Sequence, residues 1–255
     1  MLGNEKVGRL LYKLSLPAMI GMMVQALYNV VDTIFVGKGV GTLGIGGIAV
    51  VFPIQLLILA IAQTIGIGGA SRISRRMGSG DMNGAALTFG NMILLALILG
   101  ISILVSCMIA ATPLLRLFGA TETILPYAKQ YFQVFILAAP LMAFSMVSNN
   151  AARAEGNAKV AMTSMLIGAG LNIVLDPVFI FVLDMGIRGA AVATVISIGT
   201  TTLFLLGYFV SGRSEIPISL KYFRLEGGII GEILAVGSSA FVRAGSMSLI
   251  SIMKW

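Results

Sequence analysis

Six long apolar runs constrain the fold of this chain more than any other feature of its sequence. A helix that crosses a bilayer needs about 20 mostly apolar residues, and each run is long enough. The runs cover residues 12–36, 46–70, 86–112, 125–148, 160–183 and 188–210, and a further apolar run begins near residue 232. Within a bilayer a helix satisfies all of its backbone hydrogen bonds internally. The sequence therefore predicts an all-α polytopic membrane protein, a bundle of six transmembrane helices with part of a seventh.

The composition agrees with a membrane protein and excludes several other classes. Only 11% of the residues are charged, whereas a soluble domain would carry about 25%. Histidine is absent, which excludes a serine–histidine catalytic pair and an HExxH zinc site, so we expect no enzyme. The net charge of +7 could suggest a nucleic-acid partner. However, the basic residues lie between the apolar runs, so we expect the bilayer to be the partner and not nucleic acid.

The positions of the basic residues predict the orientation. The first run is too long for the apolar part of a signal peptide, so we expect it to be retained as a helix. If the amino terminus lies inside, the inner side holds Lys6, Arg9, Lys13, Arg72, Arg75, Arg76, Arg153, Lys159, Arg213, Lys221 and Arg224. The outer side then holds only Lys38, Arg116, Lys129 and Arg188. By the positive-inside rule the amino terminus is cytoplasmic, in a plasma membrane or the inner membrane of a bacterium.

A faint internal repeat predicts how the chain is divided. The stretch LSLPAMIGMMVQALYNVVDTIF from Leu14 matches LAVGSSAFVRAGSMSLISIMKW from Leu234 in length and in its basic, amphipathic lead-in. Transporters are often built from two repeated halves. We therefore expect a six-helix lobe over residues 1–224, then a cytoplasmic linker and an incomplete seventh helix over residues 225–255. The chain would then be a truncated half of a larger transporter.

Two aspartates inside the spans need an explanation, because a charged side chain in a span costs about 2.5–3.5 kcal/mol. Asp32 and Asp176 both fall in the outer third of their runs, and Thr194 lies about two turns below the outer end of its run. Asn172 precedes Asp176 by four residues, so the two share a helix face. We expect Asp32, Asp176 and Thr194, on three different helices, to share one depth. Simpler readings remain: Asp32 at headgroup level, Asp176 capping a broken helix, and Thr194 bonded to its own backbone.

A polar stripe on the first run points to a wet or buried surface. Gln25, Tyr28, Asn29 and Asp32 follow helical spacing, and such a stripe should face the bundle interior or a cavity. We expect Gln25, Tyr28 and Asn29 to line a substrate cleft. Carboxylate, amide and hydroxyl oxygens are hard donors that suit Na⁺. Two nearby carboxylates in a dry pocket can also share a proton, so Na⁺ and H⁺ both stay open.

Several motifs resemble the multidrug and toxic compound extrusion (MATE) family along the whole chain. They are LSLPAMIG and VDTIFVG in the first run, RRMGSGDMNGA in the second inner loop, NNAARAEGNAKVAM, LNIVLDPVFIF and GIRGAAVATVIS. The resemblance implies a twelve-helix fold of two lobes around a V-shaped cleft, and exchange of organic, often cationic, drugs or toxins for Na⁺ or H⁺. It implies a cation site at Asp32, Asn172, Asp176 and Thr194, and a helix kink linked to cation binding at Pro17. No cofactor is expected beyond the coupling ion.

Two alternatives to a drug antiporter remain. A flippase for a lipid-linked oligosaccharide would need arginines in its cleft for pyrophosphate, and the spans hold only Arg243. A non-transporting fragment, or a half-size subunit that assembles with the missing second lobe or as a homodimer, would account for the short chain.

Overall fold

The computed structural model describes the backbone of residues 7–238 and the side chains of residues 15–17 and 19–238, and regular structure in this part is entirely helical. Six spans are long and apolar enough to cross a membrane, as predicted. Five of them are built on α1 (Val7–Gly39), α2 (Thr42–Gly78), α3 (Met82–Ile109), α7 (Ala158–Pro177) and α8 (Gly186–Val210). The other combines α5 (Leu125–Phe135), the 3₁₀ turn η1 (Ile136–Ala138) and α6 (Ala139–Ala154). Shorter elements are α4 (Ala111–Leu117), η2 (Val178–Val182), η3 (Leu220–Tyr222) and a helix over Gly227–Ser238.

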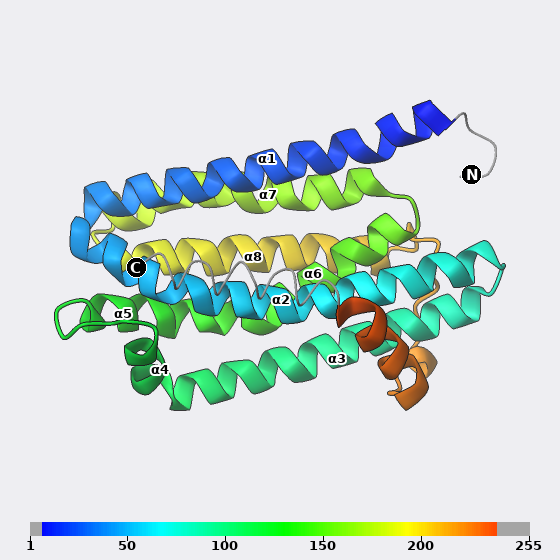
Figure 1. The fold of residues 1–255 in the computed structure, drawn as a ribbon. Coiled ribbons are helices and arrows are strands. Elements are labelled where there is room, and N and C mark those ends of the chain that lie inside the picture. The colour runs from blue at the N-terminus through cyan, green and yellow to red at the C-terminus, as the bar shows by residue number, and fades with distance from the viewer. Residues whose placement is uncertain (1–6, 239–255) are drawn as a thin grey trace.

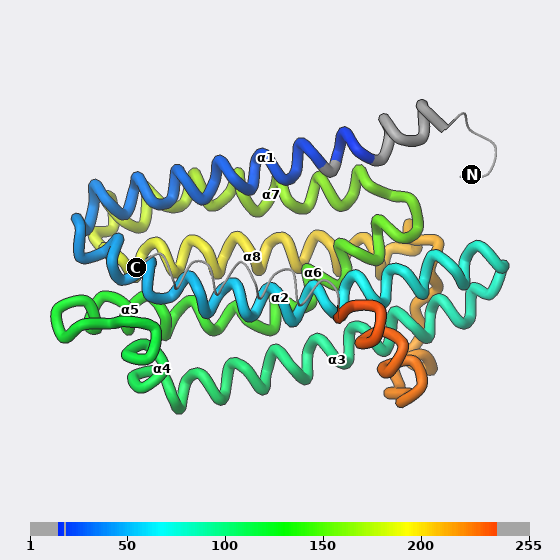
Figure 2. The backbone as a smooth tube through the Cα atoms, viewed as in Figure 1, coloured from blue at the N-terminus to red at the C-terminus, as the bar shows by residue number. Residues whose placement is uncertain are grey.

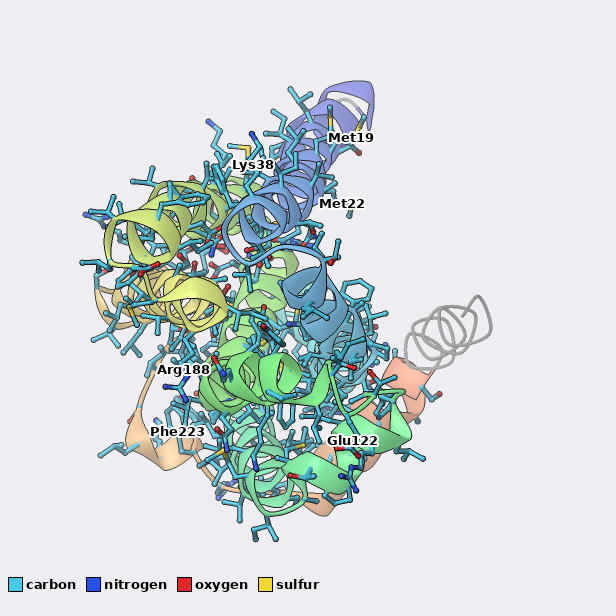
Figure 3. The ribbon with its side chains drawn as sticks, turned by 90° about the vertical axis from the view of Figure 1, so that its left-hand side faces the viewer. Met19, Met22, Lys38, Glu122, Arg188 and Phe223 are labelled. Carbon is cyan, nitrogen blue, oxygen red and sulfur yellow. The ribbon has the colours of Figure 1, made fainter. Side chains whose placement is uncertain are left out.

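The helices form a bundle in which α1 and α3 occupy opposite edges (Figure 1). The main packing pairs are α1 with α7, α2 with α6, α3 with α6, and α7 with α8. The tube in Figure 2 shows that α1 runs beside α7 along most of its length. Large apolar side chains of α1 are exposed on other sides of this helix, and Met19 and Met22 project away from the bundle (Figure 3). The edge helix α1 is therefore held chiefly by α7.

The two ends of the bundle differ in charge. One end, on the right of Figure 1, carries the α2–α3 and α6–α7 turns and the end of α8. We call it the basic end, because it holds Arg72, Arg75, Arg76, Arg153, Lys159, Arg213, Lys221 and Arg224. The opposite end holds Lys38, Arg116, Lys129 and Arg188. This grouping is the one expected from the loops, although it does not by itself say which end faces the cytoplasm.

Proline explains the main departure from the expected helices. The run over residues 125–148 was expected to be one helix, but it is broken at η1, just before Pro140 in the first turn of α6. Proline has no backbone N–H and cannot continue the preceding helix normally. At this point Gly100 of α3 allows close packing, since a Cβ there would lie 2.7 Å from the Cα of Pro140. The short helix α4 was also not expected.

The predicted linker and seventh helix, residues 225–255, are described by the structure only as far as residue 238. Helix Gly227–Ser238 packs on α2: a Cβ at Gly68 would lie 1.9 Å from the Ile233 carbonyl oxygen. Residues 239–255, which include most of the predicted seventh helix and Arg243, lie outside the described residues. The division at residue 224 therefore stays a prediction.

Candidate cation-binding site

Asp32 of α1 and Asp176 of α7 meet inside the bundle. Asp32 is 7% exposed and Asp176 is fully buried. Their carboxyl groups lie within hydrogen-bonding reach of each other. Because α1 and α7 pack side by side and run in the same direction, residues at equal depth on the two helices can meet. Asp32 does not merely end its helix, because α1 continues to Gly39 and the Asp32 side chain is buried.

Asp176 also does more than end a helix. It is the penultimate residue of α7, and after Pro177 the chain continues helically as the π-turn η2. Single π-turns within helices occur frequently at functional sites. The reading of Asp176 as a cap on a broken helix is therefore wrong, because the helix continues and the carboxyl faces inward to Asp32.

Asn172 and Thr194 connect Asp176 to α8. Both side chains are buried. When the Asn172 amide is oriented to satisfy its neighbours, its Nδ2 donates to Asp176 Oδ2 at 3.0 Å and its Oδ1 accepts from the Thr194 backbone N–H at 3.3 Å. The Thr194 hydroxyl donates to the Ala190 carbonyl at 3.0 Å, the backbone bond usual for threonine in a helix. Its oxygen still has a lone pair with which to accept a bond or bind a cation.

Two tyrosines complete the pocket from other helices. The hydroxyl of Tyr28 on α1 and that of Tyr131 on α5 each interact with the Thr194 hydroxyl. Gln55 of α2 donates its Nε2 to the Tyr131 hydroxyl at 3.3 Å. The pocket is therefore built from α1, α2, α5, α7 and α8, and each helix supplies at least one polar side chain.

Gln55 and Tyr131 were not among the site residues predicted from the sequence. Gln55 is the one polar side chain between Leu43 and Ala62, and this interruption of an apolar run was a usable signal. Tyr131 gave no such signal, because tyrosine in a membrane protein most often sits at the interface. Its burial against Gln55 depends on how α5 packs on α2 and α8, which spacing along one helix does not specify.

The other candidate residues on α1 lie outside this pocket. Gln25 and Asn29 are exposed, and the Asn29 amide donates to the Gln25 carbonyl at 2.9 Å. The expected stripe therefore splits: Tyr28 and Asp32 turn toward α7 and α8, whereas Gln25 and Asn29 face away from the described bundle. Pro17 is buried within α1, which continues through it. The cleft and kink roles of these residues stay predictions.

The charge of the pocket is unbalanced. No lysine or arginine in the described part of the chain forms an ion pair with Asp32 or Asp176. One oxygen of Asp32, Oδ1, is buried without any hydrogen-bond partner among the described residues. Buried polar atoms nearly always have partners, and a buried charge needs compensation. The site thus has the chemistry to take a cation or a proton.

The donor set favours a hard cation over a transition metal. The available ligands are carboxylate, hydroxyl and amide oxygens, which suit Na⁺-like ions. Within residues 7–238, no cluster of three or more histidine, cysteine, aspartate or glutamate side chains could hold a metal ion. The residues present therefore fit Na⁺ or H⁺ at Asp32 and Asp176.

Comparison with known proteins gives one consistent result. The family model described as MatE matches residues 17–178. The multidrug export protein MepA of Staphylococcus saprophyticus is 30% identical over 239 residues, covering 94% of this chain and 53% of MepA.

Solved structures agree with that match. An outward-facing multidrug resistance MATE family transporter is 37% identical with a TM-score of 0.89, covering 94% of this chain and 53% of that one. A MOP superfamily transporter from Pyrococcus furiosus, in which reverse polarity of the binding pocket suggests a different function, is 38% identical with a TM-score of 0.88. The match covers 94% of this chain and 53% of that one. The chain spans about half the length of these relatives. It belongs to the MatE family, the multidrug and toxic compound extrusion family that its motifs resemble.

Proposed function

We propose that this chain forms a lobe of a cation-coupled antiporter that exports organic, often cationic, drugs or toxins. The observation that carries the proposal is the buried contact between Asp32 and Asp176 without a basic partner in the described part of the chain. In this proposal Na⁺ or H⁺ neutralises the pair, and Asn172 and Thr194 hold Asp176 in place from α7 and α8.

Cation binding would act on the position of α1. A ligand shifts a conformational equilibrium only by its different affinity for the two states. With the pair neutralised, Asp32 and Asp176 can stay in contact. With both carboxylates charged, their repulsion favours separation of α1 from α7. Because α7 is the chief packing partner of α1, this separation would move α1 more than any other helix.

Pro17 provides a place in α1 for such a movement. A proline inside a helix removes one backbone hydrogen bond and favours bending at that point. Pro17 and Asp32 are 15 residues apart, so about 22 Å of helix lies between them. Bending at Pro17 would thus be amplified along this length into a displacement of the half of α1 that carries Asp32.

The relatives support the substrate class and the membrane. One is a multidrug export protein and another a multidrug resistance transporter, and we extend that activity to this chain. We also propose that the basic end faces the cytoplasm and that the membrane is the plasma membrane, on the basis of the positive-inside rule.

The test is linkage between cation and drug binding in the purified chain. If binding is mutually exclusive, Na⁺ or acid should weaken the binding of tetraphenylphosphonium, a lipophilic organic cation, and by reciprocity the drug should weaken cation binding by the same factor. Asp32→Asn combined with Asp176→Asn should abolish this effect. Asp184→Asn is the matched control, because Asp184 is an exposed aspartate outside the pocket, at the end of the bundle opposite the basic end. Drug binding that is equally cation-sensitive in the double variant contradicts the proposal.

A further inference from the structure

Residues 211–226, which we call the strap, leave α8 and turn back across the side of the basic end (orange in Figure 1). Although the strap lies outside the six spans, it exposes large apolar side chains. Leu220 is 90% exposed and Leu225 is 48% exposed, and Ile218 is also exposed. Large apolar side chains that are exposed together mark a contact surface for a membrane or another protein.

The strap is fixed to the bundle at both of its ends. Near its start, the Ser214 hydroxyl and the Glu215 backbone N–H donate to Glu155 Oε2 at 2.6 and 3.1 Å. Near its end, the Glu226 backbone N–H donates to Asn91 Oδ1 of α3 at 2.8 Å. Ile216 is buried between these points. The inner side of the strap is thus bonded to the bundle, and the exposed leucines are on its outer side.

Contact with α3 fixes the depth of the strap. A Cβ at Gly90 would lie 2.1 Å from the Tyr222 carbonyl oxygen, so the backbone of the strap touches α3 there. From Asn91 to its end at Ile109, α3 is almost wholly apolar. This stretch of helix is about 28 Å long, close to the thickness of the hydrocarbon core. The strap therefore crosses α3 close to the basic-end limit of its apolar run, which begins at residue 86.

The strap also carries two exposed cations, and Lys221 directly follows Leu220. Arg213 and Lys221 are exposed, and neither pairs with a carboxylate in the described part of the chain. Lys221 lies over the Tyr222 ring, 4.7 Å from its centroid. Arg224, by contrast, pairs with Glu226 at 2.8 Å. Unpaired basic groups next to apolar side chains at headgroup depth are the arrangement that binds anionic lipid.

We infer that the strap is an interfacial anchor for anionic phospholipids in the leaflet at the basic end. Leu220, Ile218 and Leu225 insert among the upper acyl chains, while Arg213 and Lys221 bind headgroup phosphates. Figure 3, which looks along the bundle, shows Phe223 and the strap at the periphery, where lipid can reach them. This inference does not depend on cation coupling.

The depth of Leu220 can be measured with a spin label. Cys107 is the single cysteine, so Cys107→Ser gives a background for Leu220→Cys in the whole chain, reconstituted in vesicles of phosphatidylcholine and phosphatidylglycerol. Leu203→Cys, at an exposed position within the α8 span, is the membrane reference, and Ser79→Cys, in the exposed α2–α3 turn, is the water reference. A label at 220 should favour oxygen over a water-soluble nickel complex, as at 203. Accessibility to nickel equal to that at 79 overturns the inference.

The phosphate contacts need a second measurement. The wild-type chain should unfold at a higher temperature in vesicles with phosphatidylglycerol than in phosphatidylcholine alone. Arg213→Gln combined with Lys221→Gln should abolish this difference. Lys129→Gln combined with Arg188→Gln removes equal charge at the opposite end and should preserve it. If both double variants lose the difference equally, net charge and not the strap is responsible, and the inference is wrong.

Discussion

At the scale of single residues, the main feature of the pocket is that its two carboxyl groups have no basic partner in the described part of the chain. Each ionised carboxylate removed from water is penalised by several kcal/mol unless it is paired. Asp176 receives a bond from Asn172, but Asp32 keeps an oxygen without a partner in the described part of the chain. A bound positive charge or a shared proton would offset this penalty, and we expect the neighbouring hydroxyl groups to tune the affinity of the pocket for either.

Tyr131 provides a direct test of this tuning. Tyr131→Phe removes a hydroxyl that interacts with Thr194 and accepts from Gln55, while leaving the buried ring in place. Loss of one hydrogen bond is worth about 0.5–1.5 kcal/mol, so we expect cation affinity to fall by about two- to twelvefold. Equilibrium binding of radiolabelled Na⁺, or proton uptake, measures it. Tyr127→Phe on the same helix is the control, and equal affinity in both variants would show that the Tyr131 hydroxyl does not belong to the site.

Glu155 predicts a pH dependence of stability outside the membrane spans. Burial raises the pKa of its carboxyl above the ordinary value of 4.5, although Ser214, Tyr208 and backbone N–H groups donate to it. The folded state therefore binds a proton at pH values where the unfolded state has released it. Stability should fall as pH rises through the window between 4.5 and the folded pKa.

Glu155→Gln should remove this decline. The thermal midpoint, measured across the window in the Asp32→Asn, Asp176→Asn background, isolates Glu155 from the other buried acids. The same decline with glutamine at position 155 would assign it to another group.

At the scale of elements, the contact between α8 and the π-turn η2 determines where Asp176 can lie. Gly189 permits this contact: a Cβ at this position would lie 2.6 Å from the Phe179 carbonyl oxygen, a backbone atom that cannot easily move aside. Because η2 directly follows Asp176 and Pro177, the packing of α8 on η2 helps to set the position of the carboxyl.

Gly189→Ala should therefore destabilise the fold by about 1–3 kcal/mol, because overpacking displaces η2. In an open helix position the same change usually stabilises, by about 0.5–1 kcal/mol. Gly170 of α7 is such a position, with nothing within 4 Å of its would-be Cβ, so Gly170→Ala is the control. Thermal unfolding in detergent should move in opposite directions for the two variants, and equal shifts would contradict the packing argument.

The elements also show what could be predicted from the sequence. Bilayer thickness fixes the length of an apolar run, so all six spans were found. Helices continue into polar sequence, however, and α2 extends through Arg72, Arg75 and Arg76 well past the predicted residue 70. The break before Pro140 and the helix α4 depend on local backbone geometry that hydropathy does not report.

The site was predictable to a similar degree. Depth along each helix predicted that Asp32, Asp176 and Thr194 share one level, because rise per residue is constant, and the four-residue spacing placed Asn172 on the same face as Asp176. The side of the helix that faces the bundle was harder to predict, because the polar stripe on α1 is wider than the face of α1 that packs against its neighbours. Gln25 and Asn29 lie on that wider part of α1 and remain exposed. Gln55 and Tyr131 joined the pocket through contacts between helices, which no single run encodes.

At the scale of the whole molecule, helix Gly227–Ser238 follows the six spans and the 3₁₀ turn η3, and it docks on α2. Glu232 forms ion pairs with both Arg72 and Arg75, and Arg72 is only 13% exposed. A Cβ at Gly237 would lie 2.0 Å from the Thr64 carbonyl oxygen. These contacts hold helix Gly227–Ser238 against α2.

Glu232→Gln should loosen that docking. Removing one partner of a partly buried ion pair leaves the other charge uncompensated, so we expect faster amide hydrogen exchange across residues 227–238 with little change in α3. Glu122→Gln is the control, because Glu122 is 83% exposed in its pair with Arg116 and exposed pairs contribute little. Unchanged exchange in Glu232→Gln would show that close backbone packing, not charge, holds the helix.

The most direct test of the account is whether the purified chain binds one positive charge at the two aspartates. Binding of radiolabelled Na⁺ should be measured across pH for the wild-type chain, for Asp32→Asn, for Asp176→Asn and for the Asp184→Asn control. We expect saturable uptake of Na⁺, or release of a bound proton as pH rises, in the wild-type chain and the control, and loss of both in each pocket variant. Equal cation binding by all four proteins, or none by the wild-type chain at any pH, would contradict the central claim.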